Sequence, residues 1–281
     1  MNIFEKLLGN IQILTVDELA TTIALHGQWL ADNATGKQAD LSNCNLSGLS
    51  LRRADLRQAN LAGAIMQESD LRESDFTGAD FTGARMEKAR MEDGRFVRAI
   101  FSKANLQGVA AARADFGEAN FAEANLSGGD FQWTHLRGCN FAGAAIAADF
   151  TKATLDDADI SEAKLNGCIL KNAYLGGVKL PSWIPAISNI DSQILAAITS
   201  PDGNINMEIW RSKSAGTLHR RAAWAIHIAG GAGAVLEGFF RTELAATLIY
   251  IASRPGKPAP KFIDMTDARG LQDLTDDAKI S

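Results

Sequence analysis

Few residues of the types that most often do chemistry occur in this chain of 281 residues. Two of its four histidines, His219 and His227, lie eight positions apart, which places them about 80° apart around a helix. Two histidines without a third ligand make a poor zinc site. The chain also lacks a His-Glu-x-x-His sequence, a glycine-rich phosphate loop and a serine in a nucleophile elbow. The sequence therefore predicts no catalytic, cofactor-binding or metal-binding residue.

The three cysteines give no sign of disulfide or redox chemistry. Cys44, Cys139 and Cys168 are an odd number, which argues against a disulfide framework. Each stands where a repeat, described next, otherwise has alanine or another small residue. A cysteine in such a place acts as a slightly large alanine. The start of the chain lacks a basic segment followed by an apolar run, so we expect no secretory signal and a cytoplasmic location.

A five-residue period dominates the middle of the chain. Across residues 39–180 an apolar residue recurs every five positions, with a small residue two positions before it, as in Ala-Asp-Leu-Ser-Asn from Ala39. About 29 such units follow one another. A period of five matches neither the 3.6 residues of a helix nor the 2 of a flat strand. The repeat is therefore an architecture of its own.

This pattern resembles the pentapeptide-repeat family, whose consensus is a small residue, Asp or Asn, Leu or Phe, and two variable polar positions. The resemblance implies a right-handed quadrilateral β-helix, in which each unit forms one side of a square and four units make a coil. At the ordinary spacing of strands, about seven coils would make a rod roughly 35 Å long. The predicted fold class is mainly β, with this solenoid over residues 39–180, an N-terminal helical cap and a small C-terminal helical domain.

In such a coil, residues twenty positions apart lie above one another, which predicts the contents of the core. One side should carry a ladder of four phenylalanines, and the preceding side a ladder of three. These are Phe81, Phe101, Phe121 and Phe141 on the first, and Phe76, Phe96 and Phe116 on the second. The other two sides carry mainly Leu and Met, and Met suits the irregular space beside phenylalanine stacks.

Two departures from the pattern stand out. Ala111 replaces the expected Leu or Phe, and Val109 replaces the expected Ala, so we expect the valine to fill part of the void and this coil to be the softest. Between Ile146 and Phe150 the period drops to four before it resumes. We expect a local kink there and not a domain boundary.

The segments on either side of the repeats read as helices. Residues 1–38 are expected to cap the open end of the solenoid, because an uncovered first coil invites edge-to-edge aggregation. Thr15 and Glu18 form a capping box before a stripe of Leu19, Ile23, His26 and Leu30. Residues 1–14 are expected to add a shorter helix at the same end. The alternative is that the predicted helix docks a partner.

Residues 181–262 are predicted to form a small helical domain rich in Ala and Gly, and residues 263–281 an acidic tail. The apolar run of the predicted helical domain, over residues 222–236, is shorter than the roughly 20 residues that span a membrane. The segment from Thr217 resembles a Thr-x-His-Cys-Arg-Ala-Gly-Trp sequence that follows such repeats in some phage-associated and bacterial proteins, with Arg220 in place of the cysteine. We interpret His219, Arg220 and Arg221 as surface or packing residues, with a functional site as the alternative.

The outer surface of the repeats should carry any binding function. Residues 39–180 hold 19 acidic and 16 basic residues, a net charge of −3, with signs that alternate along the predicted columns. One outward patch differs, because Trp133 falls in the column of Arg113 and Lys152 with His135 beside it. An exposed Trp between cations is a candidate protein-binding surface. The alternatives are a Trp stacked on two basic stems or one covered by the C-terminal domain.

The sequence favours a non-catalytic scaffold that binds another protein or a second copy of itself, with no cofactor and no direct binding to nucleic acid or membrane. The family resemblance implies a second hypothesis, a mimic of DNA that occupies DNA gyrase, as the quinolone-resistance members do. Mimicry requires a long field of one sign, since duplex DNA has about one negative charge per 1.7 Å. A third hypothesis places an enzyme or metal site in residues 181–262.

Overall fold

The computed structural model describes the repeats almost completely and parts of the regions that flank them. The described residues are 11–165, 167–171, 173–182, 184, 186, 190, 228–231 and 242–254. The chain divides into two units, Met1–Tyr174 and Leu175–Ser281, and each is considered by itself. The boundaries predicted at residues 38, 180 and 262 stay predictions.

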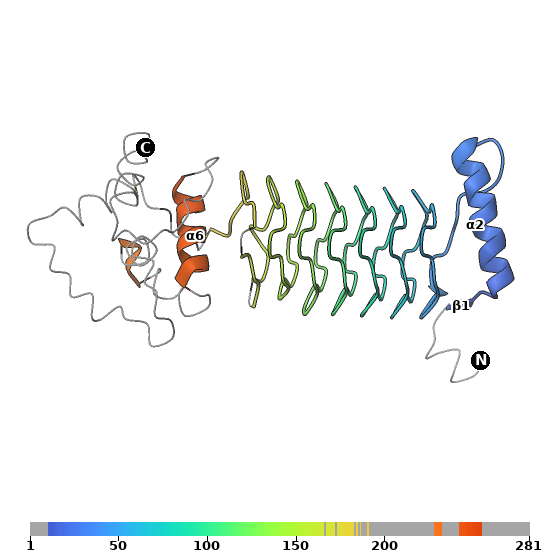
Figure 1. The fold of residues 1–281 in the computed structure, drawn as a ribbon, viewed down its shortest axis with the longest axis horizontal. Coiled ribbons are helices and arrows are strands. Elements are labelled where there is room, and N and C mark those ends of the chain that lie inside the picture. The colour runs from blue at the N-terminus through green and yellow to red at the C-terminus, as the bar shows by residue number, and fades with distance from the viewer. Residues whose placement is uncertain are drawn as a thin grey trace, which may run out of the picture. The chain divides into compact units, whose positions relative to one another are not determined.

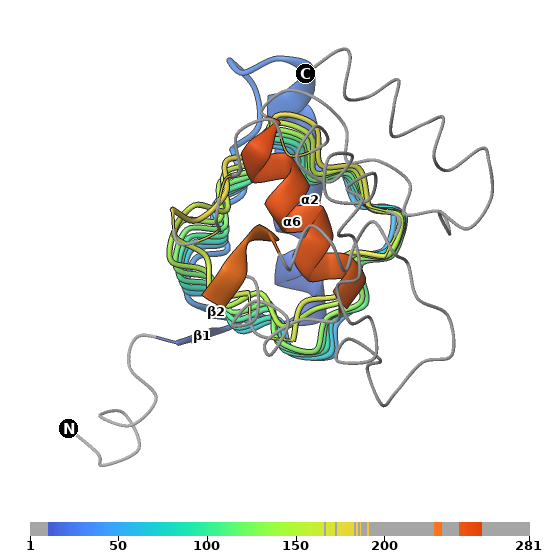
Figure 2. The same cartoon turned by 90° about the vertical axis from the view of Figure 1, so that its left-hand side faces the viewer.

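Regular parallel β-bridges join each coil to the next coil. Bridges connect residues twenty apart, beginning with Asp40 and Asn60. The amide of Leu41 donates to the carbonyl of Asn60 at 2.7 Å, and the same bond recurs along the solenoid. The coils of the first unit are evenly stacked in Figure 1, and Figure 2 shows their four-sided outline seen along the stack. The apolar residue that recurs every five positions is the central residue of its side. We name the four sides after their central residues in the first coil, which are Leu41, Leu46, Leu51 and Leu56.

Turn chemistry explains why Asp or Asn precedes the central residue. The Oδ1 atom of Asp75 accepts from the amide of Thr77 at 2.9 Å, and most other Asp and Asn side chains at this position do the same. Such local bonds favour a turn over a helix. The second residue after the centre has a positive φ on nearly every side, for example +61° at Arg53 and +62° at Trp133. These left-handed residues close the corners and point their side chains outward.

Both predicted phenylalanine ladders are confirmed. The rings of Phe81 and Phe101 stack with centroids 4.9 Å apart and planes 4° apart, and the same stacking continues through Phe121 and Phe141. On the Leu56 side, Phe96 stacks between its neighbours at 5.5 and 5.1 Å. All seven rings are fully buried. The core is therefore a set of vertical columns filled by the five-residue pattern.

The two departures in the pattern are absorbed locally. Ala111 and Val109 are both buried, in a coil that keeps its bridges to the coils before and after it. At the four-residue spacing, the pairing offset falls from 20 to 19 between Asp130 and Asp149, and it returns to 20 between Asp149 and Ile169. The missing residue shortens one corner, and the ladder continues through it.

A helix follows the predicted capping box. Helix α2 spans Val16–Ala31, and Thr15 and Glu18 exchange the two bonds of the box. Leu19 and His26 are buried, whereas Ile23 is half-buried, so the predicted stripe faces inward to different degrees. His26 joins the helix to the first coil, since its Nδ1 atom accepts from the amide of Ala39 at 3.0 Å.

Residues 11–14 differ from the helix that the sequence predicts. Strand β1 (Gln12–Ile13) pairs in parallel with strand β2 (Cys44–Asn45) and so extends the ladder of the Leu46 side by one rung. The amide of Gln12 donates to the carbonyl of Asn43 at 2.9 Å. An edge strand gains more from completing these backbone bonds than a short isolated helix gains from its own. The rest of that prediction, residues 1–10, lies outside the described residues.

In the second unit the structure describes one long helix. Helix α6 spans Thr242–Ser253, inside the segment predicted to be a helical domain. Leu248, Ile249 and Ile251 are buried. The rest of residues 181–262 lies mostly outside the described residues, so the C-terminal helical domain stays a prediction.

Candidate interaction surface

One corner of the coils carries a column of long side chains, built by the left-handed residues that end the Leu51 side. We call it the corner column, and from the first coil upward it holds Arg53, Glu73, Asp93, Arg113, Trp133 and Lys152. Backbone bonds fix its register, since the amide of Arg113 donates to the carbonyl of Gln132 at 3.0 Å and that of Trp133 to the carbonyl of Thr151 at 3.0 Å. The predicted alignment of these residues is therefore present.

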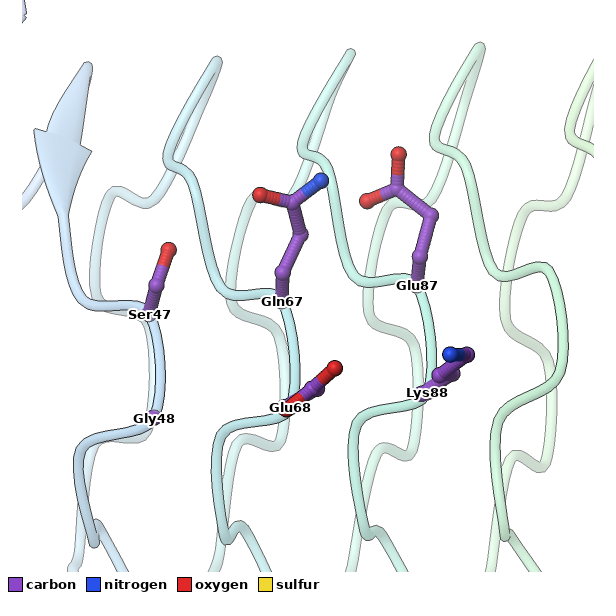
Figure 3. Close-up of a pocket in the computed structure, with 6 residues that line it drawn as sticks. All are labelled: Ser47, Gly48, Gln67, Glu68, Glu87 and Lys88. Carbon is purple, nitrogen blue, oxygen red and sulfur yellow. The ribbon is translucent and has the colours of Figure 1, made fainter.

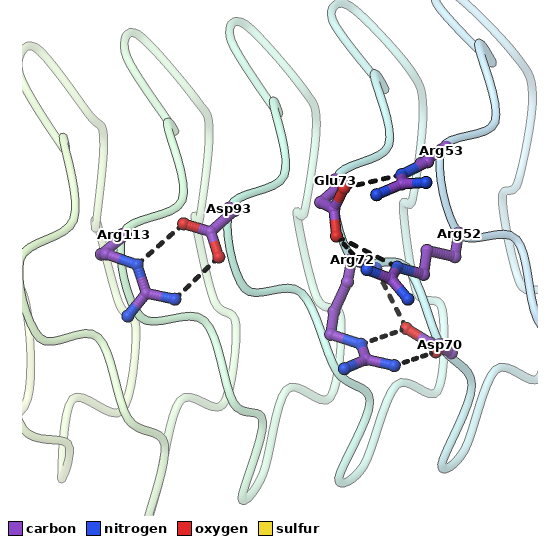
Figure 4. A network of polar contacts seen from close by, with 7 residues as sticks. All are labelled: Arg52, Arg53, Asp70, Arg72, Glu73, Asp93 and Arg113. Carbon is purple, nitrogen blue, oxygen red and sulfur yellow. Dashed lines mark hydrogen bonds and ion pairs between the residues drawn. The ribbon is translucent and has the colours of Figure 1, made fainter.

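The lower part of the corner column is filled by ion pairs between successive coils (Figure 4). Glu73 accepts from the guanidinium groups of Arg52 and Arg53. Asp93 and Arg113 form a two-pronged pair with distances of 2.8 and 2.7 Å. These hydrogen bonds lower the pKa values of the Glu73 and Asp93 carboxyl groups. Beside the column, Arg72 donates to both oxygens of Asp70 and lowers the pKa of that carboxyl to about 2.

The upper part of the corner column pairs an aromatic ring with a cation. The Nζ atom of Lys152 lies 3.9 Å from the centroid of the Trp133 ring. Trp133 nevertheless keeps 53% of its surface exposed. Arg113 does not complete the sandwich that the sequence suggests, because its guanidinium is engaged with Asp93 one coil below. Trp133 therefore keeps about half of its surface open to solvent.

His135 and an aromatic residue that sequence reasoning missed stand in the neighbouring column. Bridges place His135 above Asp115, as predicted, then Thr154 above His135 and Tyr174 above Thr154. Tyr174 is 64% exposed. The sequence contained the signal for it, since a bulky aromatic occupies a position where the repeat has Asp or Asn. We call Trp133, His135, Lys152 and Tyr174 the aromatic surface.

Apolar exposure in the described coils is concentrated near this surface. Ile169, on the Leu51 side, is 49% exposed and also occupies an Asp or Asn position. The fourth exposed large hydrophobic residue of the coils, Ile100, lies on the Leu41 side and is 37% exposed. Three of the four thus belong to the upper coils of the Leu51 and Leu56 sides. Isolated exposed apolar residues are ordinary, but a group of them is typical of binding surfaces.

An open depression of about 520 Å³ lies on the Leu46 side (Figure 3). Gln67, Glu87 and Lys88 are among its lining residues. One carboxylate oxygen of Glu87 accepts from the Nδ2 atom of Asn105 at 2.9 Å, while its other oxygen is buried without a partner. The polar residues that line the depression lie along two rows and do not converge on one point. We see no arrangement for catalysis there.

The cysteines are packed as the sequence suggests. All three are free thiols buried at small inward positions, and Cys139 donates to the carbonyl of Phe116 at 3.0 Å. Burial raises the pKa values of Cys139 and Cys168 to about 12, so these thiols are unreactive at neutral pH. Within the described ranges, no three His, Cys, Asp or Glu residues are grouped to hold a metal ion. Nor does any helix there have the length and apolar character to cross a membrane.

The remaining residues that the sequence singled out cannot be placed. His219, Arg220 and Arg221 lie outside the described residues, as does His227. Their interpretation as surface or packing residues stays a prediction.

The stacked coils, with a large and a small inward residue on each side, define a β-helical solenoid of four-sided coils. The pentapeptide-repeat family model matches in eight copies over residues 32–180, more than half of the chain, so the chain belongs to this family. Family membership makes the solenoid a right-handed β-helix.

Solved structures of other pentapeptide-repeat proteins resemble the chain. HetL from the cyanobacterium Nostoc, involved in heterocyst differentiation regulation, is 29% identical, with 52% of this chain and 80% of HetL covered and a TM-score of 0.28. QnrB1, a plasmid-mediated fluoroquinolone resistance protein, is 21% identical, with 52% and 77% covered and a TM-score of 0.40. A protein of the Arabidopsis thaliana thylakoid lumen is 24% identical, with 40% and 69% covered and a TM-score of 0.23. No curated protein sequence matches the chain.

Proposed function

We propose that this protein is a non-catalytic scaffold that binds another protein through the aromatic surface. The observation that carries the proposal is the pair of exposed aromatic side chains, Trp133 and Tyr174, in adjacent columns of the upper coils. Tryptophan and tyrosine supply most of the binding energy in many protein interfaces. The columns below carry ion pairs, so the surface is distinct from its surroundings.

A rigid base supports this surface. Each of its residues lies within two positions of a buried central residue. Trp133 follows Phe131 on the same side of its coil, and His135 directly precedes Leu136. Backbone bonds to the next coil hold Trp133 and His135 in register. A preformed surface loses little entropy on binding, which favours affinity. Lys152 adds a positive charge that suits a partner with a carboxylate near its apolar contact.

The partner should be a protein and not a nucleic acid. Protein surfaces that bind nucleic acid are strongly basic, whereas residues 39–180 carry more acidic than basic residues. The positive charges of the corner column are also largely neutralised, because Arg53 and Arg113 bind carboxylates. A second copy of this chain is one form that the partner could take.

The second candidate function is mimicry of DNA, in which the protein would occupy DNA gyrase. The arrangement of charges disfavours it. At least nine of the 19 acidic residues in the repeats lie within 4.0 Å of a Lys or Arg partner. The Leu41 side has the largest acidic excess, but in its bridged column Ile100, Asn120 and Asn140 separate Asp80 from Asp159. A continuous negative stripe of the kind that DNA presents is therefore interrupted. Gyrase supercoiling that stops at stoichiometric amounts of this protein would restore the hypothesis.

An enzyme or metal site in residues 181–262 is the third candidate, and it depends on residues outside the described ranges. Zinc analysis of the full chain tests it. Stoichiometric zinc that is lost in a His219→Ala variant would support this candidate over the scaffold.

The scaffold proposal is tested by co-purification from cells that express the full chain, after crosslinking in the cell. The double variant Trp133→Ala, Tyr174→Ala should recover at least about tenfold less of any partner, since each hot-spot aromatic contributes about 2 kcal/mol or more. Ile100→Ala is the matched control, because it removes an exposed apolar side chain from another side of the same solenoid. It should leave recovery unchanged.

Sedimentation velocity of the same three proteins separates a foreign partner from a second copy. Self-association that weakens only in the double variant identifies the second copy. A chain that is monomeric and recovers the same proteins with and without Trp133 and Tyr174 would contradict the assignment of this surface.

A further inference from the structure

His26 occupies an unusual position for a histidine, at the joint between helix α2 and the first coil. Its side chain is fully buried, and its Nδ1 atom accepts a hydrogen bond of 3.0 Å from the amide of Ala39. Its ring stacks on that of Trp29, with centroids 5.6 Å apart and planes 19° apart. This hydrogen bond ties the helix to the beginning of the repeats.

The accepting role of Nδ1 requires the neutral form of the imidazole. In that form the proton is on Nε2, which is buried without a hydrogen-bond partner. A protonated ring would carry a proton on both nitrogens, so Nδ1 could no longer accept from Ala39. Two donors would then face one another in a buried site, which costs far more than the loss of the bond alone.

The charged groups that act on His26 come from the first coil and act on its pKa in opposite directions. The carboxylate of Asp55 favours the protonated ring, as does the backbone of Arg57, while the guanidinium of Arg57 opposes it. The guanidinium itself donates to Asp55 at 2.8 Å through two nitrogens. Burial is the largest influence on His26, and it lowers the pKa of the imidazole below its ordinary value of about 6.5.

We propose that His26 is an acid-sensitive latch, which holds helix α2 on the first coil at neutral pH and releases it when the ring is protonated. Release would uncover the end of the β-helix, whose backbone edge and apolar layers are open to other chains. The latch adds pH control to one end of the solenoid and is independent of the aromatic surface.

The pH range follows from the direction of the pKa change. A histidine whose pKa is lowered in the folded protein binds fewer protons there than in the released state, so the attachment weakens as pH falls. It is complete above about pH 6.5, the ordinary value, and it is lost progressively below that until the folded pKa is reached. Asp55 does not contribute in this range, because its own pKa is lowered from 3.8.

The test is hydrogen exchange of the full chain at about pH 7.5 and about pH 5, expressed as protection factors so that the intrinsic pH dependence cancels. We expect protection of residues 16–31 to fall about tenfold for each unit by which the pKa of His26 is lowered. Protection of the central coils, for example around Phe101, should not change. The local loss separates release of the helix from unfolding of the solenoid.

Two variants make the outcome specific. In His26→Asn the side-chain oxygen takes the place of Nδ1 as acceptor but does not titrate, so the helix should stay protected at both pH values. In His135→Gln, which replaces an exposed histidine, the pH dependence of the original protein should remain. A nuclear magnetic resonance titration gives the pKa of His26 directly.

The latch is contradicted by a pH dependence that persists in His26→Asn, or by a folded pKa at or above about 6.5. If His26→Asn loses protection at both pH values, the titration decides on its own. A pKa below about 6.5 that coincides with the loss of protection in the original protein then supports the latch.

Discussion

The inner columns and the corner column belong to the same coils, yet their side chains obey different constraints. Phe101 lies between identical rings at 4.9 and 5.0 Å, so its type and orientation follow from the coils around it. Trp133 shares its column with arginines, carboxylates and a lysine, none of which is required by the turn. The turn requires only a left-handed residue there, and glycine occupies the equivalent place on many other sides.

This difference separates the part of the sequence that makes the solenoid from the part that distinguishes this solenoid from others. An inward substitution alters contacts in its own coil and in both neighbours, because packing in protein interiors is close. An outward substitution meets solvent and at most the adjacent rung. Stability should therefore be concentrated in the inner columns, and recognition in the corner column.

Phe101→Ala tests this division with the largest expected effect. The change removes a buried ring from the middle of a ladder, and truncations of this kind cost about 3–5 kcal/mol in free energy of unfolding. Denaturant unfolding measures the loss. Ser102→Ala, the next residue along the same side, is the matched outward control and should change stability by less than about 0.5 kcal/mol. Similar losses for the two variants would refute the division.

Gly94→Ala is expected to have an intermediate effect on the free energy of unfolding. The repeat pattern and the structure predict opposite signs for this effect. Most repeats have Ala at this inward position, so the repeat pattern alone predicts that alanine is accepted or stabilising. A Cβ atom at Gly94 would lie 2.6 Å from the ring of Phe96 and 3.0 Å from the carbonyl oxygen of Met91. The ring is held between Phe76 and Phe116 and cannot move freely.

We therefore expect Gly94→Ala to reduce the free energy of unfolding by about 1–3 kcal/mol, the usual range for overpacking. Combining it with Phe96→Leu should produce less than the sum of the two losses, because the smaller side chain leaves room for the methyl group. Additive losses, or a stabilised single variant, would show that the ring yields easily and that the close contact does not govern this position.

Most of the solenoid could be predicted from the sequence because each side is specified by its own five residues. The columns of Phe81 and Phe96 followed from counting in twenties, and the four-residue spacing after Ile146 was visible as a missing position. The pairing of residues 12 and 13 with the first coil was not predictable in this way, since those residues lie outside the repeat and are fixed by an unpaired edge. Local signals in residues 1–14 carry no information about that edge.

The candidate surface was predictable only in part. Trp133 and His135 were found because their columns could be counted along the sequence. The residue that Arg113 contacts could not be predicted by counting. Its choice between Trp133 above and Asp93 below depends on geometry, and the carboxylate prevailed because two hydrogen bonds to a charged group outweigh one contact with a ring. Tyr174 was missed because it occupies a turn position, where the repeat pattern predicts Asp or Asn and gives no sign of an exposed aromatic side chain.

The smallest effects are expected within the corner column, where its two kinds of contact can be compared directly. Exposed ion pairs contribute little and are screened by salt, so the coupling between Asp93 and Arg113 in a double-mutant cycle should fade at about 1 M salt. The coupling between Trp133 and Lys152 should fade less, because the lysine stem also packs on the ring. Lys152→Met keeps that stem and removes the charge, so it should retain part of the coupling that Lys152→Ala removes. Equal salt dependence of the two cycles would mean that charge alone joins successive rungs, and the upper corner would then differ from the lower one only in its exposed aromatic area.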